Sequence, residues 1–355
     1  MERADYDLAF MLQYENVSWY ENGRVKILDR RIYPTTVSYV TCSTYGEVAQ
    51  AITDMVTQSG GPYLAAAMGM ALAAYECKNK SEAEQIEFLE RAAYVISHAR
   101  PTTVKRMELV VNAALETAKA ALKEGCNVSE AIKHDTIKKT NNRYNKIAKT
   151  AKNLLDLFPN NAKVLTQCFG ETIVGMMLRE AKARNNELKM FCAETRPYFQ
   201  GARLTATVAN QQGFETTVIT DNMPAFAIQN LGIEVFTSAA DAICLDGYVV
   251  NKVGTFQIAI LSKYFGIPYF VTGAPDIGHP SVATVNIEMR DPDFVLQAMG
   301  VRTADQGVKG YYPSFDITPP HLVSAVITDR GNYSPYDLKS YYKNNSDGEY
   351  NYLKV

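Results

Sequence analysis

The hydrophobic pattern of this chain changes at Asn160 and Asn161, and that change constrains the fold more than any other feature. Before it, from about Thr44 to Lys152, apolar residues recur three and four positions apart, which is typical of amphipathic helices. After it, short apolar or β-branched runs alternate with helical stretches, which predicts a parallel, doubly wound α/β sheet. Because 355 residues exceed what one core normally serves, we expect two domains, residues 1–152 and 153–355.

The first part of the chain predicts a small β meander followed by helices. Ser18–Tyr20 and Arg24–Leu28 flank a turn whose Asn22-Gly23 step is a strong hairpin signal. The helical periodicity then covers residues 45–57, 64–75, 82–99, 103–123 and 127–153. We interpret this part as a helical N-terminal domain that ends in a long connecting helix.

The second part predicts strands over residues 162–168, 188–193, 216–220, 233–237 and 269–272, with helices over 172–183, 201–211, 223–230 and 252–265 between them. Open α/β sheets bind ligands beyond the carboxyl ends of their strands. The polar residues to consider are therefore those that follow the strands: Cys168, Glu194–Gln200, Asp221-Asn222 and Asp241.

Composition excludes several classes of protein. Net charge is −2 and no basic face is evident, so we expect no nucleic-acid partner. The charged first residues lack an apolar segment behind them, and the apolar stretches 64–75 and 258–265 are too short or too polar to span a bilayer. Six cysteines and four histidines are scattered without a CxxC pair, which indicates reduced thiols and no metal site. We expect a soluble, cytoplasmic protein with no membrane partner.

Two turns in the first domain have the chemistry of an anion site. Gly60 and Gly61 expose backbone N–H groups where Pro62 suits the first turn of a helix. Arg100 comes where a helix stops at Pro101, and its guanidinium fork matches two phosphate oxygens. The alternatives are a plain helix start for the first turn and a surface ion pair for Arg100.

The second domain adds two polar segments. Residues 194–203 place two arginines around Pro197 and Gly201 directly after an apolar strand. Ten residues after Asp241 comes the pair Asn251-Lys252, which we expect to open a helix, so that Lys252 adds a point charge to a phosphate there.

Cys168 is the cysteine in the most suggestive setting. It ends a predicted strand, Gly170 is two residues on, and a helix begins near Thr172, so the helix N-terminus would stabilise a thiolate. The alternative is that Cys168, like most cysteines, is inert filler of a core.

These segments together resemble the methylthioribose-1-phosphate isomerase family. The similarity covers nearly the whole chain and is carried by residues 19–31, Ala99–Thr102, Glu194–Pro197, Gln200–Ala206, Thr220–Met223, Ala240-Asp241, Asn251–Thr255, Arg302–Ala304 and Pro313–Pro319. The same superfamily contains 5-deoxyribose-1-phosphate isomerases, ribose-1,5-bisphosphate isomerases and initiation-factor 2B regulatory subunits.

The resemblance implies a helical N-terminal domain, a Rossmann-like C-terminal domain and a homodimer. It implies a cofactor-free aldose–ketose isomerase of methionine salvage that takes a 5-substituted ribose 1-phosphate to the ribulose 1-phosphate. Cys168 and Asp241 would be its catalytic pair. Substrate and phosphate contacts would come from Arg100, Gln200, Asn251 and Lys252, with backbone from Gly60 and Gly61. Asp241 suits an acid/base role at oxygen. Cys168 would either move a proton at carbon in an enediol route or only support a direct hydride shift.

Two departures from the family pattern leave the substituent at C5 open. Ser59 stands where the family usually has an arginine, and Phe169–Glu171 replaces the usual Asn-Ala-Gly after the cysteine. The alternatives are a 5-deoxyribose-1-phosphate isomerase, a ribose-1,5-bisphosphate isomerase, which needs a second anion site, and a non-catalytic regulatory subunit, in which the Cys/Asp pair should be lost. A nicotinamide dehydrogenase is disfavoured because no GxGxxG follows a strand.

Overall fold

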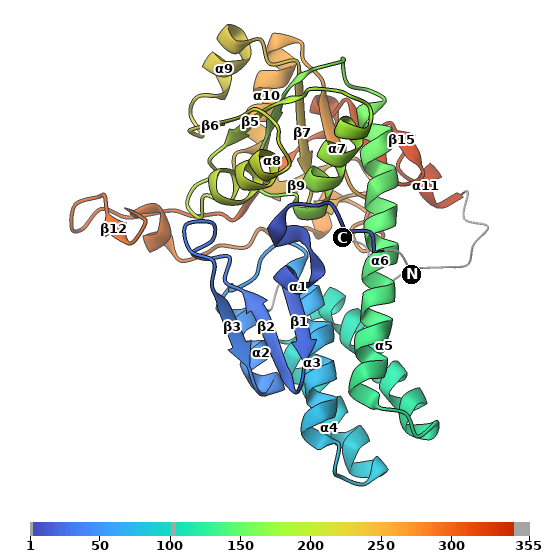
Figure 1. The fold of residues 1–355 in the computed structure, drawn as a ribbon. Helices are drawn as coiled ribbons and strands as arrows, with labels where there is room; N and C mark the ends of the chain where they lie inside the picture. The colour runs from blue at the N-terminus through green and yellow to red at the C-terminus, as the bar shows by residue number, and fades with distance from the viewer. Residues whose placement is uncertain (1–2, 101–103, 344–355) are drawn as a thin grey trace. The chain divides into compact units, whose positions relative to one another are not determined.

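The computed structural model describes residues 3–100 and 104–343, which form two compact units (Figure 1). The boundary between the units falls between Asn145 and Lys146, inside the long helix α6 (Val128–Leu155). The boundary expected from the sequence, at residue 152, lies in the same helix. Over the described ranges, no helix is both long enough and apolar enough to cross a membrane.

The first unit contains a three-stranded antiparallel sheet of β1 (Ser18–Glu21), β2 (Arg24–Leu28) and β3 (Tyr39–Cys42). Both residues of the turn between β1 and β2 have positive φ, 50° at Asn22 and 73° at Gly23. Two-residue hairpin loops of this kind match the twist of the flanking strands. The predicted hairpin is confirmed.

The rest of the first unit is helical, as the periodicity predicted. The short η1 (Phe10–Leu12) and α1 (Tyr14–Val17) precede β1, and α2 (Tyr45–Thr53), α3 (Gly61–Cys77), α4 (Glu82–Ser97) and α5 (Val104–Lys123) follow β3. α3 is buried on nearly every face because its alanines and glycines let neighbours approach closely. A Cβ on Gly69, for example, would lie 3.0 Å from Val48 Cγ1.

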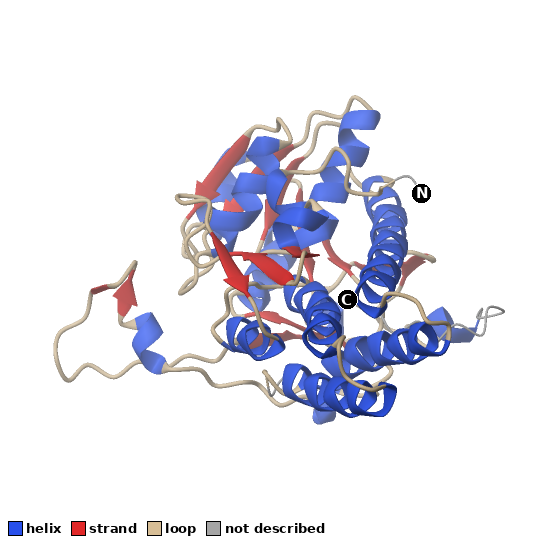
Figure 2. Cartoon of the chain, turned by 60° about the horizontal axis from the view of Figure 1, so that its bottom comes forward, coloured by secondary structure: helices blue, strands red, loops and turns tan. Residues whose placement is uncertain are grey.

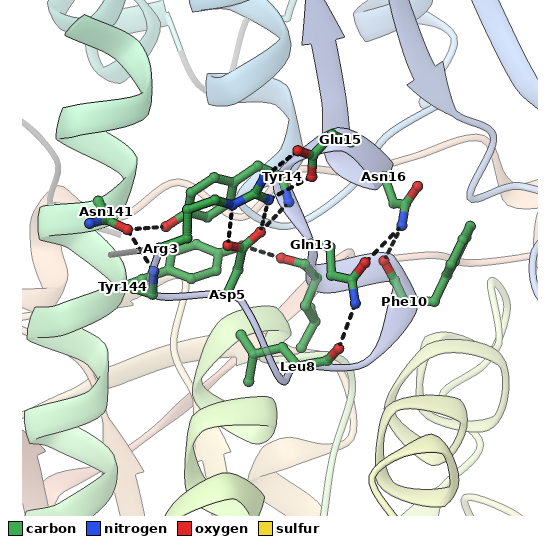
Figure 3. A network of polar contacts seen from close by, with 12 residues as sticks. Arg3, Asp5, Leu8, Phe10, Gln13, Tyr14, Glu15, Asn16, Asn141 and Tyr144 are labelled. Atoms are coloured by element: carbon green, nitrogen blue, oxygen red, sulfur yellow. Dashed lines mark hydrogen bonds and ion pairs between the residues drawn. The ribbon is translucent and has the colours of Figure 1, made fainter. Parts of the chain in front are cut away.

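A network of polar contacts joins the start of the chain to α6 (Figure 3). The side-chain oxygen of Asn141 on α6 accepts hydrogen bonds from the Ala4 backbone N–H at 2.7 Å and from the Tyr14 hydroxyl at 2.8 Å. One turn on, Tyr144 donates its hydroxyl to the Leu12 carbonyl at 2.9 Å. Since Asn141 is buried, its oxygen is the partner that keeps two buried donors satisfied.

The second unit contains a seven-stranded sheet in the order β15-β14-β10-β7-β4-β5-β6. Its strands are β4 (Lys163–Thr166), β5 (Lys189–Ala193), β6 (Thr216–Ile219), β7 (Val235–Ala239), β10 (Tyr269–Thr272), β14 (Ala325–Thr328) and β15 (Gly331–Tyr333). All neighbours pair in parallel except β14 and β15. The α/β class and the parallel sheet predicted from the sequence are confirmed.

The helices of the second unit connect these strands or, in the case of α11, follow the last of them. They are α7 (Glu171–Ala183), the five-residue π-helical turn η3 (Gly201–Thr205), α8 (Ala206–Gln211), α9 (Pro224–Leu231), α10 (Thr255–Phe265) and α11 (Ser340–Lys343). The chain runs outward from β4 to β6 and then returns to β7 on the other side of β4. The strand order therefore reverses between β4 and β7, the point at which doubly wound sheets bind their ligands.

A second, smaller sheet was missed by the sequence analysis. It has the order β13-β9-β8, from β8 (Ala242–Ile243), β9 (Val249–Lys252) and β13 (Phe315–Thr318). Asn251 and Lys252 are the last residues of β9, and α10 begins only at Thr255. The expectation that Asn251-Lys252 opens a helix is therefore wrong, because these residues pair with β13 instead.

A two-stranded ribbon, β11 (Gln297–Ala298) with β12 (Val301–Arg302), projects from the second unit (Figures 1 and 2). The short turns η4 (Val282–Thr284), η5 (Pro292–Val295) and η6 (Pro320–Leu322) lie in the same stretch of chain. Arg196 holds the base of the ribbon by donating to the Gln297 carbonyl at 2.7 Å.

We expect Asn141→Ala to lower the free energy of unfolding by about 2 kcal/mol, since it leaves two buried donors without their acceptor. Chemical denaturation followed by circular dichroism would measure this. The exposed neighbour Asn142 provides the matched control, because Asn142→Ala should change stability by less than about 0.5 kcal/mol. Equal stability of the two variants would contradict the role given to Asn141.

Candidate active site

Cys168 lies two residues beyond β4, in the turn that leads to α7. Its φ is 62°, a left-handed conformation that is uncommon for residues other than glycine. The side chain is partly exposed and lines a small cavity of about 20 Å³, enough for one water molecule. The same cavity is lined by Thr166, Thr237 and Ala239 of the adjacent strands β4 and β7.

Burial raises the pKa of the Cys168 thiol from its ordinary value of 9.0 to about 11. The positive charge of Lys252 lowers this pKa, the negative charges of Asp241 and Asp221 raise it, and a hydrogen bond from the Phe169 backbone lowers it. The sequence predicted a thiolate stabilised by a helix N-terminus. That prediction is wrong, because loss of hydration outweighs the local backbone donor. At neutral pH Cys168 carries its proton.

Asp241 lies two residues beyond β7, in an exposed bend. Its backbone N–H donates to the Val250 carbonyl at 2.8 Å, so the start of the bend is held by β9. Since β4 and β7 are paired neighbours, Cys168 and Asp241 leave the same edge of the sheet. The negative charge of Asp241 raises the pKa of the Cys168 thiol, which is consistent with this placement.

Lys252 is buried at the end of β9, between two aromatic rings. Its Nζ lies 5.6 Å from the centre of the Tyr312 ring and 5.1 Å from that of Phe315, and it donates to the Tyr312 hydroxyl at 3.3 Å. Burial lowers the pKa of Lys252, while the charges of Cys168 and Asp241 raise it. Lys252 is thus a desolvated amine whose protonated form both members of the Cys168/Asp241 pair favour.

The turn between β9 and α10 is held by Asp316 of β13. Its carboxylate accepts the backbone N–H groups of Gly254 at 2.6 Å and Phe256 at 3.1 Å, at the first turn of α10. Burial nevertheless raises the pKa of Asp316 to about 6. Beside it, the Asn251 amide donates to the Thr255 hydroxyl at 3.0 Å, which fixes the other end of this turn.

The segment after β5 brings Gln200 into the same unit. Gln200 is buried, and its side-chain oxygen has no hydrogen-bond partner among the residues that the structure describes. The π-helical turn that follows begins at Gly201, where a Cβ would lie 1.7 Å from the Ala193 carbonyl oxygen. A glycine is required for that approach.

The remaining predicted contacts belong to the first unit. Gly60 is the N-cap of α3, and both Gly60 and Gly61 are buried. Arg100 is partly buried and lies beyond the end of α4 at Ser97. Pro101 and Thr102, which the sequence analysis placed next to it, lie outside the described residues.

The described portion of the chain contains no group of three or more His, Cys, Asp or Glu side chains arranged to hold a metal ion. The polar residues that do gather at the sheet edge are two carboxylates, a thiol, a lysine and two amides. This set is suited to moving protons and holding an oxygen-rich anion.

Several residues of this edge were not found from the sequence. Tyr312 covers Lys252, and Thr195 and Thr205 contact the backbone of Cys168 at 3.0 and 2.5 Å. Threonine and tyrosine are ordinary strand and core residues, so only the adjacent β-branched residues Val249-Val250 and Ile317-Thr318 were a usable signal for this part of the fold.

Comparison with known proteins agrees with the resemblance. The model of the initiation factor 2 subunit family matches residues 58–335. A methylthioribose-1-phosphate isomerase of Chloroflexus aurantiacus is 35% identical over 89% of this chain and 94% of its own. Another, from Geobacillus kaustophilus, is 35% identical over 90% and 93%.

Solved structures give the same picture. The 5-methylthioribose 1-phosphate isomerase from Pyrococcus horikoshii matches with a TM-score of 0.79 at 28% identity, over 92% of this chain and 95% of that one. The delta subunit of translation initiation factor eIF-2B from A. fulgidus also matches with a TM-score of 0.79 at 28% identity, over 90% and 96%.

We expect alkylation of Cys168 by iodoacetamide to accelerate with pH and to be still rising at pH 10, because its pKa is raised to about 11. Lys252→Met should slow the reaction at a given pH by removing a charge that lowers this pKa, and Asp241→Asn should speed it. Peptide mass spectrometry would follow Cys168, with exposed Cys126 as internal reference and Lys263→Met as control for an exposed lysine. A plateau below pH 9 would contradict the assignment.

Proposed function

Because this chain belongs to the initiation factor 2 subunit family and is similar over nine-tenths of its length to methylthioribose-1-phosphate isomerases, we propose that it isomerises 5-methylthioribose 1-phosphate to 5-methylthioribulose 1-phosphate. This aldose–ketose reaction belongs to methionine salvage. One observation carries the proposal beside this similarity. Cys168 and Asp241 follow the ends of the neighbouring strands β4 and β7, where the strand order reverses.

The chemistry needs proton transfer at two oxygens. The bond from C1 to the ring oxygen breaks, the ring oxygen gains a proton, hydrogen moves from C2 to C1, and the C2 hydroxyl loses its proton to leave a ketone. We assign proton exchange at oxygen to Asp241, an exposed carboxylate at the sheet edge. Cys168 stands by C1 and C2. Its raised pKa favours the thiol over a thiolate base for the C2 proton, which supports a direct hydride shift from C2 to C1 with Cys168 in a supporting role over an enediol route in which Cys168 takes the C2 proton and returns it to C1.

Substrate contacts complete the proposal. We assign the phosphate and sugar hydroxyls to Lys252, Asn251 and Gln200 in the second unit. The burial of Lys252 and the unpartnered oxygen of Gln200 support this, since buried polar groups without partners are rare and costly. In the first unit, we assign contacts with the phosphate and sugar to Arg100 and to the backbone of Gly60 and Gly61. This assignment rests on the resemblance to the family.

The reaction moves hydrogen within one molecule and changes no overall oxidation state, so we propose that it proceeds without a cofactor. We also propose a homodimer located in the cytoplasm. Several exposed apolar residues on and beside the β11–β12 ribbon, including Met299 and Tyr311, support an association surface, and six free cysteines suit a reducing compartment.

Three alternative functions differ in what they require of the site. A 5-deoxyribose-1-phosphate isomerase would use the same catalytic pair, and the altered Ser59 and Phe169–Glu171 segments leave room for a different C5 substituent. A ribose-1,5-bisphosphate isomerase needs a further anion site. A regulatory subunit is favoured by the similarity to the eIF-2B delta subunit, but it would have no use for the Cys168/Asp241 pair.

We expect a panel of 5-methylthio-, 5-deoxy- and 5-phospho-ribose 1-phosphates to give the highest kcat/KM for the methylthio sugar. A pocket that prefers one apolar substituent over a smaller one typically discriminates by about 10- to 200-fold. Product formation followed by NMR would measure each rate. A preference for the 5-deoxy or 5-phospho sugar would replace the proposed substrate, and no turnover of any of the three would favour the regulatory subunit.

The catalytic pair can be tested by Asp241→Asn, which should leave substrate binding intact and lower kcat by at least about 100-fold, the usual scale of general acid–base catalysis. The matched control is Asp246→Asn, in the loop that follows β8. Cys168→Ser should lose comparable activity if the thiol moves a proton, and much less if hydride shifts directly. Full activity of Asp241→Asn would remove this carboxylate from the mechanism.

A further inference from the structure

The backbone of Cys168 is held by two threonine hydroxyls from different parts of the chain. Its N–H donates to Thr195 Oγ1 at 3.0 Å, and its carbonyl accepts from Thr205 Oγ1 at 2.5 Å. Both threonines are fully buried. A residue at φ 62° needs such support, because this conformation is disfavoured for a side chain with a Cβ.

Thr195 is itself fixed from the next strand along the sheet. Its hydroxyl accepts the Cys168 N–H and donates to the Ala193 carbonyl at 3.0 Å. Its backbone N–H and that of Arg196 donate to the two oxygens of the Asp221 carboxylate at 2.8 and 2.6 Å. Asp221 follows β6, so hydrogen bonds run along the sheet edge from the end of β6, through the end of β5, to Cys168 beyond β4.

Thr205 is fixed from the π-helical turn. It is the last residue of η3, whose first residue, Gly201, lies against the Ala193 carbonyl at a distance that no Cβ would allow. π-Turns inside helices frequently occur at functional sites because they change the direction of particular side chains. Here the turn ends with the Thr205 hydroxyl directed at the Cys168 carbonyl.

We infer that Thr195 and Thr205 are positioning residues that hold Cys168 in its left-handed conformation and so direct the thiol toward the reacting carbons. We call the two hydrogen bonds from Thr195 and Thr205 to the Cys168 backbone the clamp. Its effect on catalysis rests on the proposed function, but its effect on the direction of the thiol does not. Both threonine hydroxyls bond to backbone atoms of Cys168 and not to its sulfur, so each acts through the backbone. Loss of one hydroxyl should therefore leave substrate affinity unchanged while the thiol becomes misdirected and more accessible.

Thr205→Val tests the clamp, because valine has nearly the shape of threonine and lacks the hydroxyl. We expect kcat to fall at least about 10-fold, with KM within about 2-fold of wild type, as for loss of an interaction that serves only the transition state. Alkylation of Cys168 at pH 8 should become several-fold faster. Thr205→Ser restores the hydroxyl and should recover most of both values.

Thr207→Val is the matched control. Its hydroxyl donates to the Arg203 carbonyl at 2.7 Å in the same stretch of helix and does not bond to Cys168, so its kcat and its thiol reactivity should match wild type. If Thr205→Val fails to fold, Asp221→Asn provides a second test. Asp221 is partly exposed, and this change weakens the hydrogen bonds that its carboxylate accepts from the Thr195 and Arg196 backbone, so kcat should also fall.

The two readouts separate the inference from the proposed function. A folded Thr205→Val with wild-type kcat and wild-type alkylation of Cys168 would overturn the inference. If the wild-type protein turns over no sugar phosphate, the proposed function fails. Faster alkylation of Cys168 in Thr205→Val but not in Thr207→Val would then still support the clamp, and equal rates would still refute it.

Discussion

The candidate site depends on the parallel pairing of β4 with β7. The chain builds one half of the sheet outward from β4 and the other half outward from β7, so these two strands meet where the order reverses. Their register sets Thr166 beside Thr237, and Cys168 and Asp241 each follow two residues beyond the end of their strand. Because the two strands are parallel, the thiol and the carboxylate share the carboxyl edge of the sheet.

Burial then sets the electrostatic character of that edge. Removal from water disfavours the charged form of any group, so it raises the pKa of Cys168 and lowers that of Lys252. Each group's charge opposes the shift of the other without cancelling it. Under the proposed function, a phosphate bound at Lys252 would add a negative charge that favours the ammonium form. Substrate binding and protonation of Lys252 are therefore linked.

The sequence predicted those parts of the fold that depend on local pattern. The β1–β2 hairpin, the helices of the first unit and the parallel strands all follow from periodicities of 3.6 or 2 residues and from turn chemistry. The sheet of β8, β9 and β13 was missed because its partners are far apart in the chain: Lys252 pairs with Phe315. Lys252 was wrongly assigned to a helix for the same reason, because its pairing with a distant strand cannot be read from the local pattern. The thiolate expected at Cys168 failed for a related reason, because a helix N-terminus can be read from sequence but burial cannot.

The two departures from the family pattern fall at turns before helices and leave the strands untouched. Ser59, with φ 58°, precedes α3, and Glu171, with φ 34°, opens α7 two residues after Phe169. Changes confined to such turns alter which groups line a site without disturbing the sheet that aligns Cys168 with Asp241. Under the proposed function, reaction class and substrate identity depend on different parts of this chain. The pairing of β4 with β7 bears on the first, and the turn at the start of α7 bears on the second, which is why the proposed isomerase chemistry follows more directly from the fold than does the group at C5.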